Sequence, residues 1–196
     1  MELDQRTFKV DDLKIECREN GKPEIIGHAS VFDIIGDGGW FREKVVPGAF
    51  KDSLMVDDIR MLWNHNTDIV MSRNKIGNPN GTLELAEDIK GLAVKATPSA
   101  TGLMRGYLDM IERGDVSQMS FGFQVLLKDW IEEDGEKDLR LLKKIKLWET
   151  SPVTFPFYKS TDVAIKREHA EWRSSISPKH IYKSKLYRRR LNLGLR

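Results

Sequence analysis

The sequence predicts a mainly β protein of the α+β class: a bent antiparallel β-barrel of about seven strands flanked by helices. Short segments rich in β-branched and aromatic residues recur along the chain. Several neighbouring segments are joined by short polar turns, which favours antiparallel pairing. Only one segment shows a long helical spacing of apolar residues. The helices are therefore expected to flank the sheet rather than to form the core.

The first half of the chain contains four of these elements. A strand is predicted at 25–33, followed by a glycine-containing loop at 34–40. Pro47 suits the first turn of a short helix. In the segment 59–65, apolar residues alternate onto one face, and the predicted strand ends at His65. The segment 82–97 reads as a hairpin with a polar turn.

The second half adds one helix and two long strands. Helical spacing of apolar residues predicts the helix at 99–114, with Ser99 or Thr101 as its cap and Gly114 at its exit. Strands are predicted at 118–127 and 139–149, with a polar turn between them, and a further strand at 162–166.

Composition excludes several classes of protein. The 196 residues are 40% hydrophobic and 32% charged, which is typical of a folded globular chain. No run approaches the roughly 20 apolar residues of a membrane helix, and the N-terminal residues lack an apolar signal segment, so we expect a cytoplasmic protein without membrane contact. The single cysteine, Cys17, excludes an internal disulfide. The histidines show no metal-binding spacing, and we predict neither a metal nor a cofactor.

The charge distribution divides the chain in two. From Lys166 onward, ten Lys and Arg residues stand against two acids, a local balance of +8, whereas the preceding residues have a balance of -6. We therefore predict a domain over 1–166 and a basic tail over 167–196 that is flexible or docks on a partner. Such a tail suits acidic protein surfaces or nucleic acid.

His65 is the first candidate for catalysis, because the chain has only four histidines and two of them lie in or beside the basic tail. An imidazole can act as a general base near neutral pH. Alternatively, His65 is an ordinary polar residue at the end of a strand.

Ser120 is the candidate nucleophile that such a base would serve. Alternation places Met119, Phe121 and Phe123 on one face of the predicted strand and Ser120 with Gly122 on the other. The small glycine leaves room for a substrate backbone to approach the hydroxyl. Alternatively, Ser120 lies on the solvent face of an ordinary strand.

Glu149 ends the second long strand and could orient a histidine by accepting its ring N–H. Its alternative role is a salt bridge with Lys143, Lys144 or Lys146. Spacing alone does not join His65, Ser120 and Glu149, because triads are recognised by geometry and not by sequence distance.

Other nucleophiles compete with Ser120. Ser117 is one, and Ser151 is another, although Pro152 after it favours a turn. Cys17 and His28 would form a different dyad. Glycines at 36–39 or near Gly114 are candidates to supply the backbone donors of an oxyanion hole.

Several segments in order carry a resemblance to a known family. They are GHASVFD at 27–33, FREKVVPGAF at 41–50, LWNHN at 62–66, KGLAV at 90–94, GDVSQMSFGF at 114–123 and WETSPVTFP at 148–156. Over residues 25–166 the chain resembles the prohead (capsid maturation) serine proteases of tailed bacteriophages. These are similar in fold to the herpesvirus assemblins, which are β-barrels ringed by helices.

The resemblance implies a function and a site. The family's histidine corresponds to His65, its serine to Ser120 and its acidic residue to Glu149. The implied substrates are the scaffolding segment of the major capsid protein and the protease itself, cut inside the precursor capsid in the host cytoplasm. A homodimer is expected by likeness to the assemblins. The alternative is a non-enzymatic capsid scaffold or shell-binding module.

Overall fold

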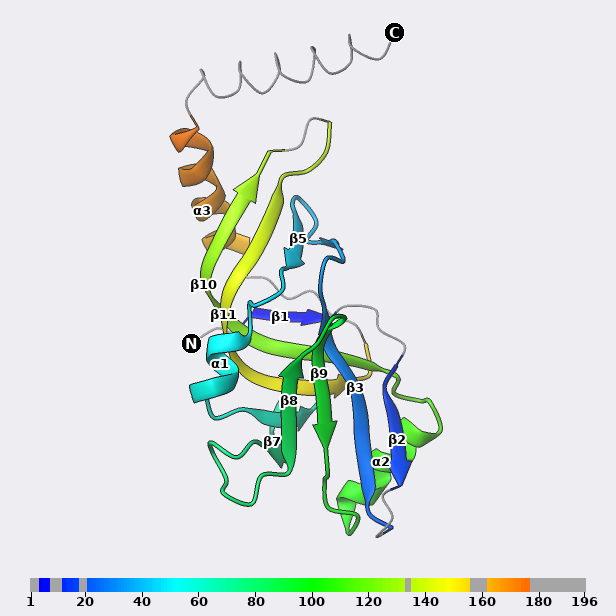
Figure 1. The fold of residues 1–196 in the computed structure, drawn as a ribbon. Helices are drawn as coiled ribbons and strands as arrows, with labels where there is room; N and C mark the ends of the chain where they lie inside the picture. Colours follow the sequence, from blue (N-terminus) through cyan, green and yellow to red (C-terminus); the bar gives the residue numbers. More distant parts are fainter. Residues whose placement is uncertain (1–3, 8–11, 18–20, 133–134, 156–161, 177–196) are drawn as a thin grey trace, which may run out of the picture. The chain divides into compact units, whose positions relative to one another are not determined.

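The computed structural model describes residues 4–7, 12–17, 21–132, 135–155 and 162–176 (Figure 1). Its contacts divide the chain into one unit over Met1–Ser160 and a second over Thr161–Arg196. The first unit contains all the described strands, in two sheets, together with two helices. In the part of the chain that the structure describes, no helix is long and apolar enough to cross a membrane.

The larger sheet is built around two long strands, β10 and β11, which form an antiparallel ribbon (Figure 1). β1 pairs with the other edge of β10. The far edge of β11 is shared by β5 and β6, which both run parallel to it, and β4 and β7 extend these two branches. The strands are β1 (Asp4–Thr7), β4 (Gly36–Asp37), β5 (Arg42–Val45), β6 (Arg60–Trp63), β7 (Asn66–Arg73), β10 (Gln118–Ile131) and β11 (Leu139–Val153).

The smaller sheet is antiparallel throughout, in the order β2-β3-β9-β8. Its turn between β8 and β9 is closed by Asp88, whose carboxylate accepts hydrogen bonds from the backbone N–H groups of Lys90 and Gly91. Such a local Asp bond is a common device in tight turns. The strands are β2 (Lys14–Cys17), β3 (Pro23–Val31), β8 (Leu83–Glu87) and β9 (Gly91–Ala96).

The described residues form three helices. α1 (Lys51–Val56) and α2 (Leu103–Glu112) belong to the first unit, and α3 (Asp162–Ser175) belongs to the second. α1 contacts β11, and its buried Ser53 hydroxyl accepts a hydrogen bond of 2.8 Å from the backbone N–H of Leu147. α2 buries Leu108 and Ile111 and follows β9 in the chain. Gly102, and neither Ser99 nor Thr101, is the N-cap of α2, and no side chain caps it.

The hydrophobic core lies between the two sheets and includes the inward face of β10. Phe121 and Phe123 are fully buried and stack at 4.8 Å between ring centroids, and Phe50 meets Phe121 edge-on. Alternation therefore divides β10 as predicted, with Met119, Phe121 and Phe123 in the core. Ser120 and Gly122 occupy the other face of the strand.

The mainly β fold is confirmed, but closure into a barrel is not. The described strands form an open seven-stranded sheet and a separate four-stranded sheet. The pairing is mostly antiparallel, as expected, and the two parallel pairs both involve β11. There are also more strands than predicted, because β1, β2, β4 and β7 are short or irregular in pattern.

The second unit shows that one predicted strand is wrong, and most of the predicted tail lies outside the described residues. Residues 162–166, predicted as a strand, form the start of α3. A helical spacing fits them better because the helix continues to Ser175. Most of the predicted basic tail, residues 177–196, lies outside the described residues.

Candidate active site

His65 is presented by a two-residue turn between β6 and β7. Trp63 pairs with Asn66, and the residues between them, Asn64 and His65, both have positive φ, 53° and 59°. Positive φ at both central positions is the requirement of a type I′ hairpin turn. Asn accepts this conformation readily, whereas His does so at some cost.

Two contacts with β11 fix the turn that carries His65. The backbone N–H of Asn64 donates to the carbonyl of Pro152 at 2.9 Å. The backbone N–H of His65 donates to the hydroxyl of Ser151 at 3.2 Å. The left-handed turn is thus tied to the end of β11, and the imidazole is directed toward β10 and β11.

Ser120 and Glu149 lie on neighbouring strands, close to this turn. Ser120 pairs with Ser151 across the β10–β11 ladder, and Glu149 pairs with Gly122. The Ser120 hydroxyl oxygen lies 2.8 Å from His65 Nε2, and Glu149 Oε1 lies 2.7 Å from His65 Nδ1. The Ser120 and Glu149 side chains are therefore each within hydrogen-bond distance of the His65 ring, on its two opposite nitrogens.

Ser151 contacts the second carboxylate oxygen of Glu149. The sequence predicted a turn at Ser151. The Ser151 hydroxyl donates to Glu149 Oε2 at 2.5 Å, and Ser151 is fully buried. Its hydroxyl also accepts the His65 backbone N–H. Ser151 thus connects the carboxylate with the histidine turn. Its hydroxyl donates to Glu149, whereas the hydroxyl in contact with the His65 ring is that of Ser120.

Gly122 gives space to the glutamate rather than to a substrate. A methyl group on Gly122 would overlap Glu149 Oε1, the oxygen that contacts His65. The sequence predicted that this glycine leaves room for a substrate backbone. In the structure, the Glu149 carboxylate fills that room.

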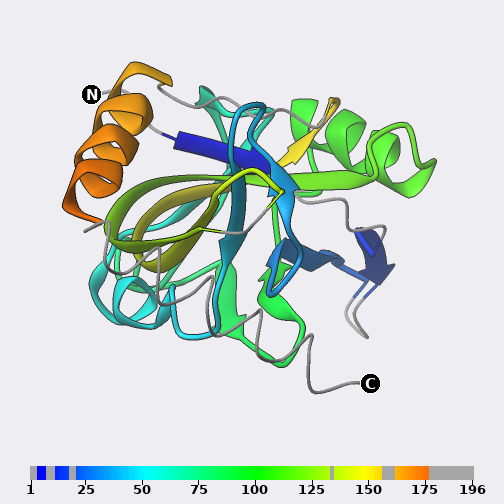
Figure 2. The same ribbon diagram turned by 90° about the horizontal axis from the view of Figure 1, so that it is seen from above.

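The surroundings of Ser120 differ from the open face that alternation suggested. Ser120 is fully buried, and Thr7 of β1 lies opposite it in the ladder between β1 and β10. Figure 2 shows β1, in dark blue, seen from above. The Ser120 hydroxyl is 2.8 Å from the carbonyl oxygen of Arg6, to which it donates a hydrogen bond. Sequence reasoning missed this strand, since four residues with mixed polarity carry little β pattern.

The competing interpretations of the candidate residues do not match the contacts in the structure. Lys143, Lys144 and Lys146 pair with Asp129, Asp52 and Asp57, not with Glu149. His28 contacts Asp12 through Nδ1 at 2.6 Å and Asp88 through Nε2 at 2.9 Å, so neither ring nitrogen serves Cys17. Ser117 is exposed, one residue before β10 begins.

The glycines considered for an oxyanion hole use their N–H groups locally. Gly38 donates to the carbonyl of Phe41, Gly39 to the Asp37 carboxylate and Gly114 to the carbonyl of Ile111. Their role as oxyanion donors stays a prediction, and it would require these turns to rearrange.

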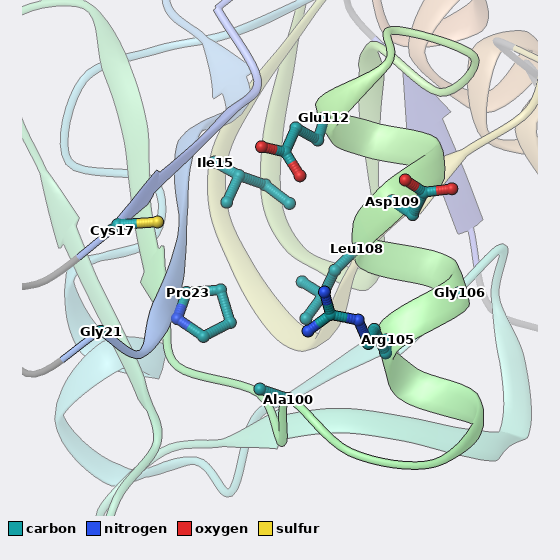
Figure 3. A pocket seen from close by; sticks show the side chains of 10 residues that line it. All are labelled: Ile15, Cys17, Gly21, Pro23, Ala100, Arg105, Gly106, Leu108, Asp109 and Glu112. Carbon is teal, nitrogen blue, oxygen red and sulfur yellow. The ribbon is translucent and has the colours of Figure 1, made fainter.

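A separate pocket of about 460 Å³ lies between α2 and the β2–β3 pair (Figure 3). Arg105, Asp109 and Glu112 of α2 line one side, and Ile15, Cys17 and Pro23 line the other. None of His65, Ser120 and Glu149 borders it. The pocket is therefore separate from the three candidate residues.

The two contacts on the His65 ring are of the kind that acyl transfer by a serine uses, while the Ser120 hydroxyl itself donates to the Arg6 carbonyl. An imidazole at hydrogen-bond distance from a hydroxyl can take its proton, and a carboxylate on the opposite ring nitrogen fixes the tautomer and stabilises the imidazolium. The Glu149 side chain is 7% exposed and that of His65 is 13% exposed, so solvent screens their interaction little.

Comparison with known protein families identifies the chain. Residues 11–175 match the family described as the Caudovirus prohead serine protease, and the chain belongs to that family. The resemblance seen in the sequence is thereby confirmed. Comparisons with curated proteins and with solved structures find no match.

Proposed function

We propose that this capsid maturation protease cleaves the scaffolding segment of the major capsid protein, and itself, with a catalytic triad of Ser120, His65 and Glu149. The observation that carries the proposal is the pair of contacts on the His65 ring, to Ser120 at 2.8 Å and to Glu149 at 2.7 Å. Family membership supports the reaction class and the capsid protein as substrate.

The proposed reaction has two steps. His65 Nε2 takes the Ser120 proton while the Ser120 oxygen attacks the scissile carbonyl carbon. The carbon–nitrogen bond then breaks, and His65 passes the proton to the leaving amine, which leaves an acyl-enzyme. A water molecule deprotonated by His65 releases the acyl fragment and restores the serine. Glu149 remains ionised throughout and stabilises the imidazolium.

The protease would act inside the precursor capsid in the infected host cell. Its macromolecular partners would be the capsid precursor and the scaffold, and a homodimer is the expected assembly. The alternative function is a non-enzymatic scaffold or shell-binding module. That alternative predicts stable full-length protein and no covalent reaction with a serine-directed phosphonate.

The test incubates purified wild-type and Ser120→Ala protein with the capsid precursor and maps the fragments by mass. We expect Ser120→Ala to lose about 10⁴- to 10⁶-fold in kcat. Glu149→Gln should lose about 10²- to 10⁴-fold. Ser117→Ala is the matched control and should cleave at the wild-type rate. Normal processing by Ser120→Ala would refute Ser120 as the nucleophile.

A further inference from the structure

Strand β1 occupies the edge of β10 that carries Ser120. Residues Asp4 to Thr7 pair antiparallel with Phe123 to Ser120, and β11 covers the opposite edge of β10. An exposed strand edge beside a nucleophile is where an extended peptide can add by main-chain hydrogen bonds. β1 lies before residue 11, where the family match begins. It therefore covers the nucleophile from outside the family-matched sequence.

The contact between β1 and Ser120 opposes the proposed reaction. A serine hydroxyl has one hydrogen, and in this structure it is donated to the Arg6 carbonyl. His65 cannot accept that hydrogen at the same time. In a reacting peptide, the carbonyl oxygen must instead face oxyanion donors while its carbon faces Ser120. β1 thus brings a peptide carbonyl to the nucleophile in an unreactive orientation.

The side chain of Arg6 anchors β1 in a buried acidic site. Arg6 is fully buried, and its Nε lies 2.5 Å from Oε1 of Glu43, which is also fully buried. The guanidinium lies 5.5 Å from the centre of the Phe123 ring. Arg140 contacts the other Glu43 oxygen at 2.9 Å. Glu43 therefore keeps a cationic partner when Arg6 leaves, which lowers the cost of vacating the site.

We propose that β1 is an intramolecular competitor of the substrate, and that Glu43 selects substrates with a basic residue immediately before the scissile bond. The inference rests on the proposed function of Ser120. The substrate would add to β10 as an extended strand in place of β1, with its basic side chain against Glu43. The residue before the cleaved bond is assigned by Arg6, because the Arg6 carbonyl is the one at Ser120.

The first test measures how fast a small fluorophosphonate labels Ser120 in full-length wild type, Arg6→Ala and Arg6→Glu. Arg6→Glu places a second carboxylate against Glu43 and should release β1. We expect labelling at least tenfold faster than in wild type, with Arg6→Ala between the two. Lys14→Ala, which alters an exposed basic residue of another short strand, is the matched control and should label like wild type.

The outcomes of labelling separate the two proposals. Equal rates in wild type and Arg6→Glu, with Ser120→Ala unlabelled, would overturn the competitor role of β1 and leave Ser120 as the nucleophile. No labelling in any variant would overturn the proposed function and this inference with it. Thermal unfolding of each variant shows whether the remaining fold is intact.

The second test uses peptides with the Arg6→Glu protein, after thermal unfolding has shown that its remaining fold is intact. A peptide of residues 2–9, ELDQRTFK, should slow labelling of the Arg6→Glu protein. The same peptide with Gln in place of Arg should have an effect on the labelling rate that is at least tenfold weaker. Digestion of a mixed decapeptide pool by the Arg6→Glu protein should favour bonds after Arg or Lys. Glu43→Gln in the same background should lose that preference. Equal action of the two peptides, or cleavage without preference for a basic residue, would refute the role of Glu43.

Discussion

The hydroxyl of Ser151 donates a hydrogen bond to Oε2 of Glu149, the carboxylate oxygen that does not contact His65. The same hydroxyl accepts the backbone N–H of His65. One buried side chain therefore sets the direction of the carboxylate and the position of the histidine turn together. A carboxylate that must accept the imidazole N–H benefits from such a second support, because its orientation determines the tautomer of the ring.

Ser151→Ala should reduce kcat about tenfold with little change in KM, because it releases the carboxylate without touching the substrate. Burial of the unpaired His65 N–H should also cost about 1 to 2 kcal/mol of unfolding free energy. Ser151→Thr keeps the hydroxyl and should restore part of kcat, and Ser117→Ala is the neutral control. Cleavage kinetics on one peptide substrate check the prediction. A Ser151→Ala protein as active as wild type would show that Glu149 needs no support.

Gly122→Ala should impair catalysis through Glu149. The added methyl group would occupy the position of Glu149 Oε1 and displace it from His65. We expect kcat to fall about 10- to 100-fold, as for other small misplacements in an active site.

Gly106→Ala is the matched control for this change. Gly106 lies within α2, and no neighbouring atom would meet its methyl group. This variant should keep full activity and gain about 0.5 to 1 kcal/mol of stability, because alanine favours the helix. An unchanged kcat in Gly122→Ala would mean that Glu149 has another productive position.

The sequence predicts the elements with strong periodicity well and those without it poorly. The segment 118–127 alternates clearly and forms part of β10, and the hairpin at 82–97 forms β8 and β9. The parallel pairs of β11 with β5 and β6 join residues far apart in sequence, and no local pattern encodes them. Without those pairs, a closed antiparallel barrel was the simplest arrangement of the remaining strands.

The candidate site shows the same division between local and long-range information. Residue type and strand face make His65, Ser120 and Glu149 candidates, and the family resemblance is what joins them into one predicted site. The sequence does not indicate Ser151 as a supporting residue, because its contact with His65 spans 86 residues and its contact with Glu149 depends on how β11 places both side chains. The contact between Ser120 and the Arg6 carbonyl joins residues 114 positions apart, and the buried ion pair between Arg6 and Glu43 is also remote in sequence.

The pKa of Asp12 gives a prediction for stability against pH. Burial of the Asp12 carboxyl raises its pKa, but hydrogen bonds from Lys90 and His28 outweigh burial, and the pKa lies below its ordinary value of 3.8. A carboxyl whose pKa is lowered by folding stabilises the protein above its ordinary pKa. That contribution disappears as the pH falls through the lowered pKa of the folded state.

Asp12→Asn should therefore lower the unfolding free energy at pH 7 by about 1 kcal/mol, the usual value of a hydrogen-bonded pair. The difference from wild type should shrink as the pH falls below 3.8. Thermal unfolding of both proteins across pH 2 to 7 provides the measurement, with the exposed Asp68→Asn as control. A difference that stays constant over this range would show that the charge of Asp12 does not contribute.

The basic segment 177–196 should recruit the protease to the precursor shell rather than take part in cleavage. It carries seven Lys and Arg residues and no acid, and it lies beyond the family match that ends at residue 175. A chain ending at Ile176 should cleave peptides at the wild-type rate but enter shells poorly when expressed with the capsid precursor.

Replacing Arg188, Arg189 and Arg190 with alanine should reduce entry, whereas lysine at the same positions should preserve it, because the attraction depends on charge. Added salt should weaken binding, and sensitivity to nuclease would identify nucleic acid, rather than an acidic scaffold surface, as the partner. Normal entry of the shortened chain would show that the tail has no docking role.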